Sequence, residues 1–145
     1  MNYGRLVLAA VVATVVDAAY GLVVWARLLN GEFTRYPEIY RPAGDMNGFA
    51  IMFAGILAAM LVASYIYAKG YEGGSAVAEG LKFGVVLALL MALYISSTDY
   101  GTLRIGKKMM LTYLGGQFGE FLLAGLVIGL VYRPAGAAAR RAAGV

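Results

Sequence analysis

The sequence contains no cysteine and no histidine. The lack of cysteine excludes disulfide bonds, thiolate metal ligands and cysteine nucleophiles. The lack of histidine excludes imidazole metal ligands, histidine-ligated haem and histidine general bases. The side chains left for chemistry are carboxyl, hydroxyl, amide and basic groups, and no set of them indicates hydrolysis or group transfer. We therefore expect that the protein is not an enzyme and that it binds no metal.

Charged residues are also scarce, since they make up 14% of the 145 residues, whereas a soluble domain has about 25%. Hydrophobic residues make up 61%, and the mean hydropathy is +0.74. Four apolar stretches, at about 6–29, 47–67, 79–97 and 105–132, are each long enough to cross a bilayer. The sequence therefore predicts an all-α fold, a four-transmembrane-helix bundle. It forms a single membrane domain over 1–132, followed by a flexible basic tail over 133–145.

The first apolar stretch also has features of a secretory signal peptide. Arg5 precedes its apolar core, and small residues near Val16 and Ala18 would suit a signal peptidase. The apolar run nevertheless continues past that point as far as Trp25 and beyond. We therefore expect an uncleaved helix that crosses the membrane.

The basic residues leave the orientation of the chain undecided. Four spans place both termini on one side, and lysine and arginine are then equally divided between the two sides, so the positive-inside rule gives a tie. The basic tail favours a bacterial inner membrane protein with both termini in the cytoplasm. Dual topology, in which copies insert both ways, is the alternative. The net charge of +4 is too small and dispersed to indicate a nucleic-acid partner.

Small residues recur at helical spacing in every stretch. Lipid tails are as apolar as leucine, so membrane helices associate where small side chains let their backbones approach. The predicted packing residues are Gly80, Gly84, Ala88, Ala92, Gly55, Ala59, Gly115, Gly119, Gly125 and Gly129. Besides the lipid bilayer, these faces predict further copies of the chain or other membrane subunits as partners.

Two carboxylates lie near the middle of predicted spans, Asp17 in the first and Glu120 in the fourth. An ionisable residue there costs about 2.5–3.5 kcal/mol on insertion scales, so it faces protein or water. The two stretches run antiparallel, so the carboxylates can reach a similar depth and meet. Thr14 and Tyr20 lie within reach of Asp17, and Gln117 lies within reach of Glu120. No basic residue lies at that depth, so we expect the pair to be partly protonated at rest.

Three interpretations of these carboxylates remain open. Protonated carboxyl groups can join two helices by hydrogen bonds, or the pair can bind a proton that a cation displaces, or it can contact a partner or a pigment. No cofactor is predicted, although a lipid or pigment held between the helices stays open. The aromatic residues near the ends of the stretches, Trp25 among them, are interpreted as interfacial belts.

The turn at 69–75 (Lys-Gly-Tyr-Glu-Gly-Gly-Ser) and the following Glu-Gly-Leu-Lys-Phe-Gly at 79–84 resemble small four-helix bacterial membrane proteins of unknown function. The outline of the chain is also similar to that of the small multidrug resistance transporters. These have four short helices, a membrane-embedded acid in the first, a glycine-rich fourth and a balanced charge. This chain departs from them because it is longer, has an aspartate as its first acid and carries a second acid in its fourth stretch.

Two functions compete on these observations. The first is an accessory or structural subunit of a larger membrane complex, which the small size, the small-residue faces and the lack of reactive side chains favour. The second is a proton-coupled transporter of a small or cationic solute, in which Asp17 and Glu120 exchange a proton for the substrate. The sequence places the accessory subunit slightly ahead.

Overall fold

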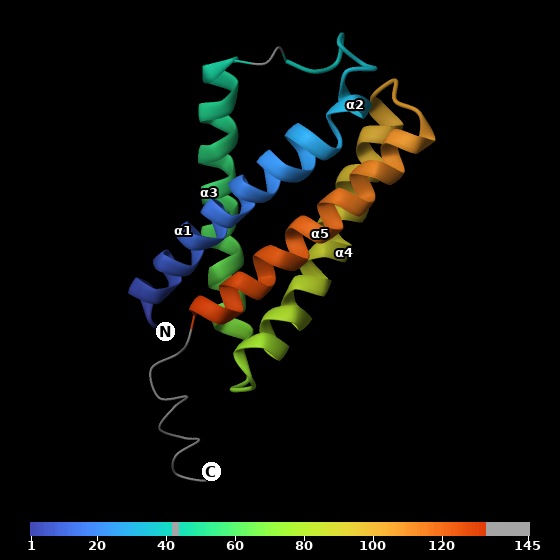
Figure 1. Cartoon of the computed structure of the whole chain (residues 1–145). Helices are drawn as coiled ribbons and strands as arrows, with labels where there is room; N and C mark the ends of the chain where they lie inside the picture. The colour runs from blue at the N-terminus through green and yellow to red at the C-terminus, as the bar shows by residue number, and fades with distance from the viewer. Residues whose placement is uncertain (42–43, 133–145) are drawn as a thin grey trace, which may run out of the picture.

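The computed structural model describes residues 1–41 and 44–132, and within these ranges the chain is helical, with no strand. The predicted tail at 133–145 lies outside the described residues. The helical elements are α1 (Tyr3–Tyr20), the π-helix η1 (Gly21–Leu28), α2 (Asn30–Phe33), α3 (Met46–Gly70), α4 (Ala76–Thr102) and α5 (Lys107–Val131). α1 and η1 form one continuous rod, and this rod, α3, α4 and α5 are each long and apolar enough to cross a membrane (Figure 1). The all-α prediction is therefore confirmed for the described chain.

Polar side chains fix where three of the long helices begin. Asn2, Asp45 and Ser75 stand just before α1, α3 and α4, and each side chain accepts a backbone N–H from the first turn of its helix. Such N-caps satisfy donors that have no partner inside the helix. A sharp turn with Gly73 at φ 93° joins α3 to α4, as the glycines of the predicted turn suggest.

One predicted connection is helical in the structure. The sequence suggests a link at 98–104, whereas α4 continues to Thr102. The hydroxyl groups of Ser97 and Thr102 donate to backbone carbonyls one turn earlier in α4. These polar side chains therefore find their hydrogen-bond partners within the helix and do not end it. The other three long helices begin and end within three residues of the predicted bounds.

Glycines bring the backbones of α4 and α5 into direct contact. A Cβ atom added to Gly84 would stand 2.7 Å from the carbonyl oxygen of Leu122, and one added to Gly125 would overlap the backbone of Gly84. Gly80 and Gly129 meet in the same way one turn away. Farther along α4, Ala88 and Ala92 are completely buried. The two helices form an antiparallel hairpin (Figure 1).

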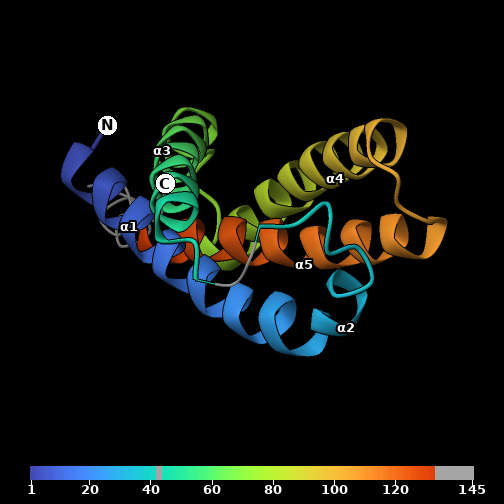
Figure 2. The same cartoon turned by 90° about the horizontal axis from the view of Figure 1, so that it is seen from above.

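The remaining core lies where α1 crosses α3 and α5. Its buried side chains are small on α1, where Ala9, Ala10 and Ala13 have no exposed surface, and larger on the other two helices, with Met60 of α3 and Ile128 of α5. Only the second half of α3 takes part. Seen from above, α3 and α4 stand apart on the same side of α5 (Figure 2).

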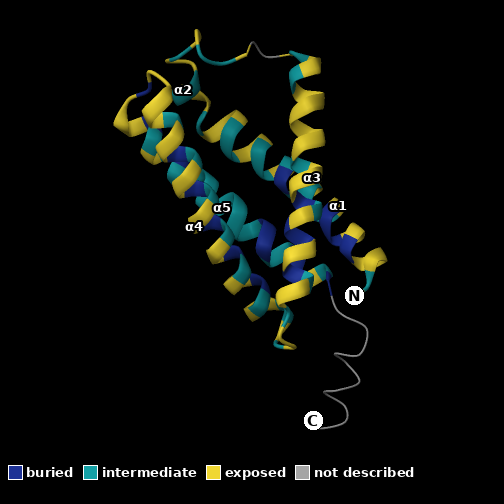
Figure 3. Ribbon diagram, turned by 180° about the vertical axis from the view of Figure 1, so that it is seen from behind, coloured by how far each residue is buried: buried dark blue, intermediate teal, exposed yellow. Residues whose placement is uncertain are grey.

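Within residues 1–41 and 44–132, no helix covers the first half of α3. From 46 to 59, every residue except Gly48 and Ile56 is exposed (Figure 3). Gly55 and Ala59, two of the predicted packing residues, lie in this segment, and a Cβ at Gly55 would meet nothing within 4 Å among the described residues. Gly115 is likewise exposed and lines a shallow apolar groove between 88–93 of α4 and 111–118 of α5.

Candidate functional site

The carboxyl groups of Asp17 on α1 and Glu120 on α5 lie within hydrogen-bonding reach of each other. Asp17 is buried, with 8% of its surface exposed, and Glu120 is half-buried. An ionised carboxylate only accepts hydrogen bonds, so a hydrogen bond between the two groups requires a proton on one of them. The helix contact between α1 and α5 therefore contains a place that can hold a proton.

Trp25 is the polar neighbour that the sequence interpretation missed. Its indole N–H donates to both carboxylate oxygens of Glu120, 3.3 Å from Oε1 and 3.2 Å from Oε2. The side chain is half-buried against α5, so it contacts the protein as well as the surroundings of the helix. Its place in an interfacial belt stays a prediction.

The π-helix explains why the position of Trp25 is hard to foresee. In an α-helix of 3.6 residues per turn, a residue eight positions after Asp17 points about 80° away from it. In η1 the hydrogen bonds join residues five apart, as where the N–H of Leu29 donates to the carbonyl of Val24 at 2.8 Å. This wider winding turns the helix less per residue, and it carries Trp25 back to the side that faces α5.

Glycines of α5 make room for the side chains of the first rod. The Tyr20 hydroxyl donates to the carbonyl oxygen of Gly116 at 2.7 Å. A Cβ at Gly119 would stand 2.7 Å from that hydroxyl, and a Cβ at Gly116 would overlap the Trp25 ring. Gly119, which the sequence assigns to helix packing, thus accommodates Tyr20, and Tyr20 lies one turn from the carboxyl pair.

Two of the predicted site residues have other partners. The Thr14 hydroxyl donates to the carbonyl of Ala10 in its own helix at 2.9 Å. Gln117 accepts a hydrogen bond from Ser96 of α4 at 3.4 Å, so its amide links α5 to α4. The structure therefore gathers Asp17, Glu120, Tyr20 and Trp25, and it directs Thr14 and Gln117 elsewhere.

An aromatic cluster closes one end of the site. Tyr113 of α5 lies edge-on to Trp25, with 6.1 Å between ring centroids, and it also contacts Phe33 of α2. The hydroxyls of Tyr113 and Tyr40 share a hydrogen bond. Burial raises the pKa of Tyr40, so its hydroxyl stays protonated at neutral pH. The segment after η1, residues 29–41, thus packs rings and neutral hydroxyls around Trp25, the member of this cluster that bonds to Glu120.

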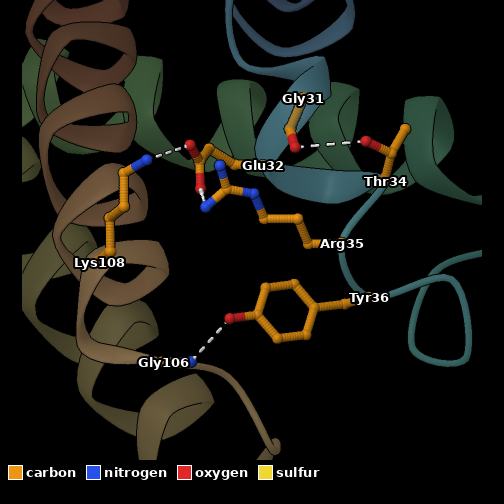
Figure 4. A network of polar contacts seen from close by, with 7 residues as sticks. All are labelled: Gly31, Glu32, Thr34, Arg35, Tyr36, Gly106 and Lys108. Carbon is orange, nitrogen blue, oxygen red and sulfur yellow. Dashed lines mark hydrogen bonds and ion pairs between the residues drawn. The ribbon is translucent and has the colours of Figure 1, made fainter.

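Ion pairs hold this segment against the start of α5. Glu32 pairs with Lys108 of α5 and with Arg35 of its own segment, and the backbone N–H of Gly106 donates to the Tyr36 hydroxyl at 3.0 Å (Figure 4). The hydrogen bond from Lys108 lowers the pKa of Glu32. None of the ion pairs between described residues involves either carboxylate of the candidate site.

The site offers too few ligands for a divalent metal ion. Calcium takes six to eight oxygen ligands and magnesium six. The site offers two carboxylates, and across the described ranges no group of three acidic side chains gathers as a metal site. The arrangement suits a proton or a monovalent cation better.

Comparison with protein-family models, with curated proteins and with solved structures finds no match for this chain. The functional argument therefore depends on the residues of the site themselves.

Proposed function

We propose that the four long helices cross the bilayer and that the protein is a proton-coupled transporter of a small or cationic solute. The observation that carries this proposal is the contact between Asp17 and Glu120 near the middle of two adjacent helices. Two carboxylates in contact within an apolar bundle strongly disfavour double ionisation. A bound proton or another cation neutralises them, and the two compete for the same oxygens.

The contact of Trp25 with Glu120 favours proton exchange at the carboxyl pair over a permanent hydrogen bond that only joins the two helices. Its N–H donates to Glu120 but cannot accept a proton, because the indole nitrogen is a donor only. The indole therefore stabilises the ionised state of Glu120 when the proton leaves. A pair that served only to join α1 and α5 would need no such donor.

A second candidate is an accessory subunit of a larger membrane complex. The first half of α3 favours it, because residues 46–59 are exposed around the helix, which leaves a long apolar surface for another membrane protein. The two candidates differ in what happens at the carboxyl pair, so the same variants separate them.

The beginning of α1 and the end of α5 lie at the same end of the molecule, where the backbone N–H of Asn2 donates to the Tyr132 hydroxyl at 3.4 Å. We propose that this end faces the cytoplasm of a bacterial inner membrane. The end that carries α2 then faces outward.

Proton release from the purified protein in detergent tests the transporter. We would add sodium, ammonium or tetramethylammonium chloride to the wild type in weakly buffered solution and measure the protons released per chain. We expect up to one proton per chain with at least one cation, and loss of this release in Asp17→Asn and Glu120→Gln. Glu38→Gln, which changes an exposed acid of the segment after η1, is the matched control and should behave as the wild type.

Infrared spectroscopy of the same samples provides the second readout. The band of a protonated carboxyl group should be present in the wild type and absent from both site variants. Equal release from all four proteins would overturn the proposal. Normal assembly of both site variants, with no release from any protein and a fixed ratio to other proteins after gentle native extraction, would support the accessory subunit instead.

A further inference from the structure

Two buried hydroxyl groups in the core have no hydrogen-bond partner among the described residues. They are Ser64 Oγ and the Tyr67 hydroxyl, both on α3. Ser64 is completely buried and Tyr67 is 3% exposed. Buried polar groups in proteins are almost always hydrogen-bonded, to protein or to an internal water. These two orphaned groups therefore point to a ligand that offers hydrogen bonds.

The two hydroxyls lie one turn apart on α3, where that helix meets α1 and α5. Tyr67 belongs to the same core as Ala13 of α1 and Ala124 of α5. Asp17 follows Ala13 by four residues, and Glu120 precedes Ala124 by four, so each carboxylate stands about 6 Å along its helix from this core. Tyr67 packs against Tyr132 near the end of the molecule where α1 begins, about 18 Å along α5 from Glu120. The orphaned hydroxyls thus lie in the core between the carboxyl pair and that end, with Ser64 one turn closer to the pair.

Tyr67 also lies near a carboxylate at that end. Glu79, in the first turn of α4, stands one turn before Phe83, whose ring centroid lies 5.4 Å from that of Tyr67. The Tyr132 ring packs on Tyr67 as well, with 6.0 Å between centroids. Glu79, Tyr67 and Ser64 are therefore met in that order on going from this end of the molecule toward the carboxyl pair.

We propose that Ser64 and Tyr67 bind internal water, and that this water carries protons between the Glu79 end of the molecule and the Asp17–Glu120 pair. An internal water needs two to four polar partners, and the two hydroxyls supply the first two. In each transfer one O–H bond breaks and one forms on the next oxygen, so the water and the hydroxyls regain the protons that they pass on. This inference rests on the proposed function, because it requires a pair that exchanges protons.

The opposite end of the site, next to Tyr40 and Tyr113, offers protons a poorer route. There the hydroxyls of Tyr40 and Tyr113 bond to each other, and the aromatic cluster packs around Trp25, whose N–H is directed at Glu120. Exchange through the Ser64–Tyr67 side should therefore dominate.

Hydrogen–deuterium exchange of the protonated carboxyl group tests the route. The reconstituted full-length protein is transferred to D₂O, and the shift of the carboxyl band is followed in time by infrared spectroscopy. We expect Ser64→Ala and Tyr67→Phe each to slow this exchange at least tenfold. Ser64→Thr keeps a hydroxyl and should restore the wild-type rate. The matched control is Tyr65→Phe, on the exposed side of the same helix, which should leave the rate unchanged.

A second measurement covers the case in which a variant fails to fold. Wild-type protein in H₂¹⁸O should show an isotope-sensitive O–H band of a weakly bonded internal water that Ser64→Ala lacks. Unchanged exchange in both variants, or a wild type without such a band, would overturn the water route. If the wild type has no protonated carboxyl band at neutral pH, the proposed function itself fails. A normal band with equal exchange rates in all variants contradicts the water route alone.

Discussion

Trp25 and Glu120 are hydrogen-bonded across a separation of 95 residues in the sequence. The bond joins the π-helical end of the first rod to the middle of α5, beside the carboxyl of Asp17. It is the contact through which the unusual backbone of η1 acts on the candidate site.

Replacing Trp25 by phenylalanine keeps an aromatic ring in the cluster and removes the indole N–H. We expect a loss of about 1.5–3 kcal/mol in the free energy of unfolding, the usual contribution of a hydrogen bond to a charged group. We also expect a shift of the Glu120 carboxyl band in the infrared spectrum. Unfolding in mixed micelles measures the first effect. Tyr94→Phe, at an exposed position of α4, should change neither quantity, and an unchanged carboxyl band in Trp25→Phe would contradict the assigned bond.

The glycine contact between α4 and α5 makes a sharper prediction about stability. Gly84→Ala and Gly125→Ala each place a methyl group against backbone atoms of the other helix. We expect each to lower the free energy of unfolding by about 1–3 kcal/mol or more, as overpacking does. Gly55→Ala meets no neighbour in the described structure, and it should be neutral or stabilising by up to about 1 kcal/mol, because alanine favours a helix. Equal effects at all three positions would refute the close approach.

Acid should loosen the segment after η1. The hydrogen bond from Lys108 lowers the pKa of Glu32 below its ordinary value of 4.5, and Arg35 adds to the effect. A carboxyl group whose pKa is lower in the folded protein stabilises it above that ordinary value, and the contribution is lost as the pH falls through the folded pKa.

We therefore expect the amide proton of Gly106, which is bonded to Tyr36, to exchange faster as the pH falls below the ordinary glutamate pKa of 4.5, after correction for intrinsic exchange. Glu32→Gln carries no charge at any pH, so its corrected rate should be high and independent of pH. Nuclear magnetic resonance in micelles measures both. Identical pH profiles for the wild type and Glu32→Gln would show that the ion pair does not hold the segment.

The lack of native cysteine makes the orientation directly measurable. Asn2→Cys and Glu38→Cys place single thiols at opposite ends of the molecule, on exposed or half-buried positions. In intact cells of a bacterial host, an impermeant maleimide should label Glu38→Cys and spare Asn2→Cys, which becomes reactive after lysis. Labelling of both in intact cells would indicate dual topology, and the reversed pattern would place the termini outside.

The sequence predicts the helical architecture well, because four long apolar stretches separated by polar turns allow few alternatives. It also indicates that Asp17 and Glu120 can meet, since antiparallel helices place them at a similar depth. The partners of Thr14 and Gln117 were less accessible to prediction. Residues that share a helix face with a carboxylate have several acceptors within reach, and the crossing of the helices decides which one is used.

Trp25 and Gly55 show two further limits. Helical spacing assumes 3.6 residues per turn, so a π-helix changes which residues share a face. The residue types in 21–28 do not predict that this segment is a π-helix. A glycine pattern shows that a close approach is sterically allowed, but it cannot show which helix is present to make it. Gly84 and Gly125 have such a neighbour, whereas Gly55 has none within the described chain.

The direct backbone contact at Gly84 and Gly125 makes α4 and α5 the most closely packed pair among the described helices. Glu120 belongs to this pair, whereas Asp17 lies on α1, which packs against it from outside. If the shared proton leaves, two like charges face each other across the contact between α1 and α5, so we expect that contact, and not the glycine contact, to be the one that loosens.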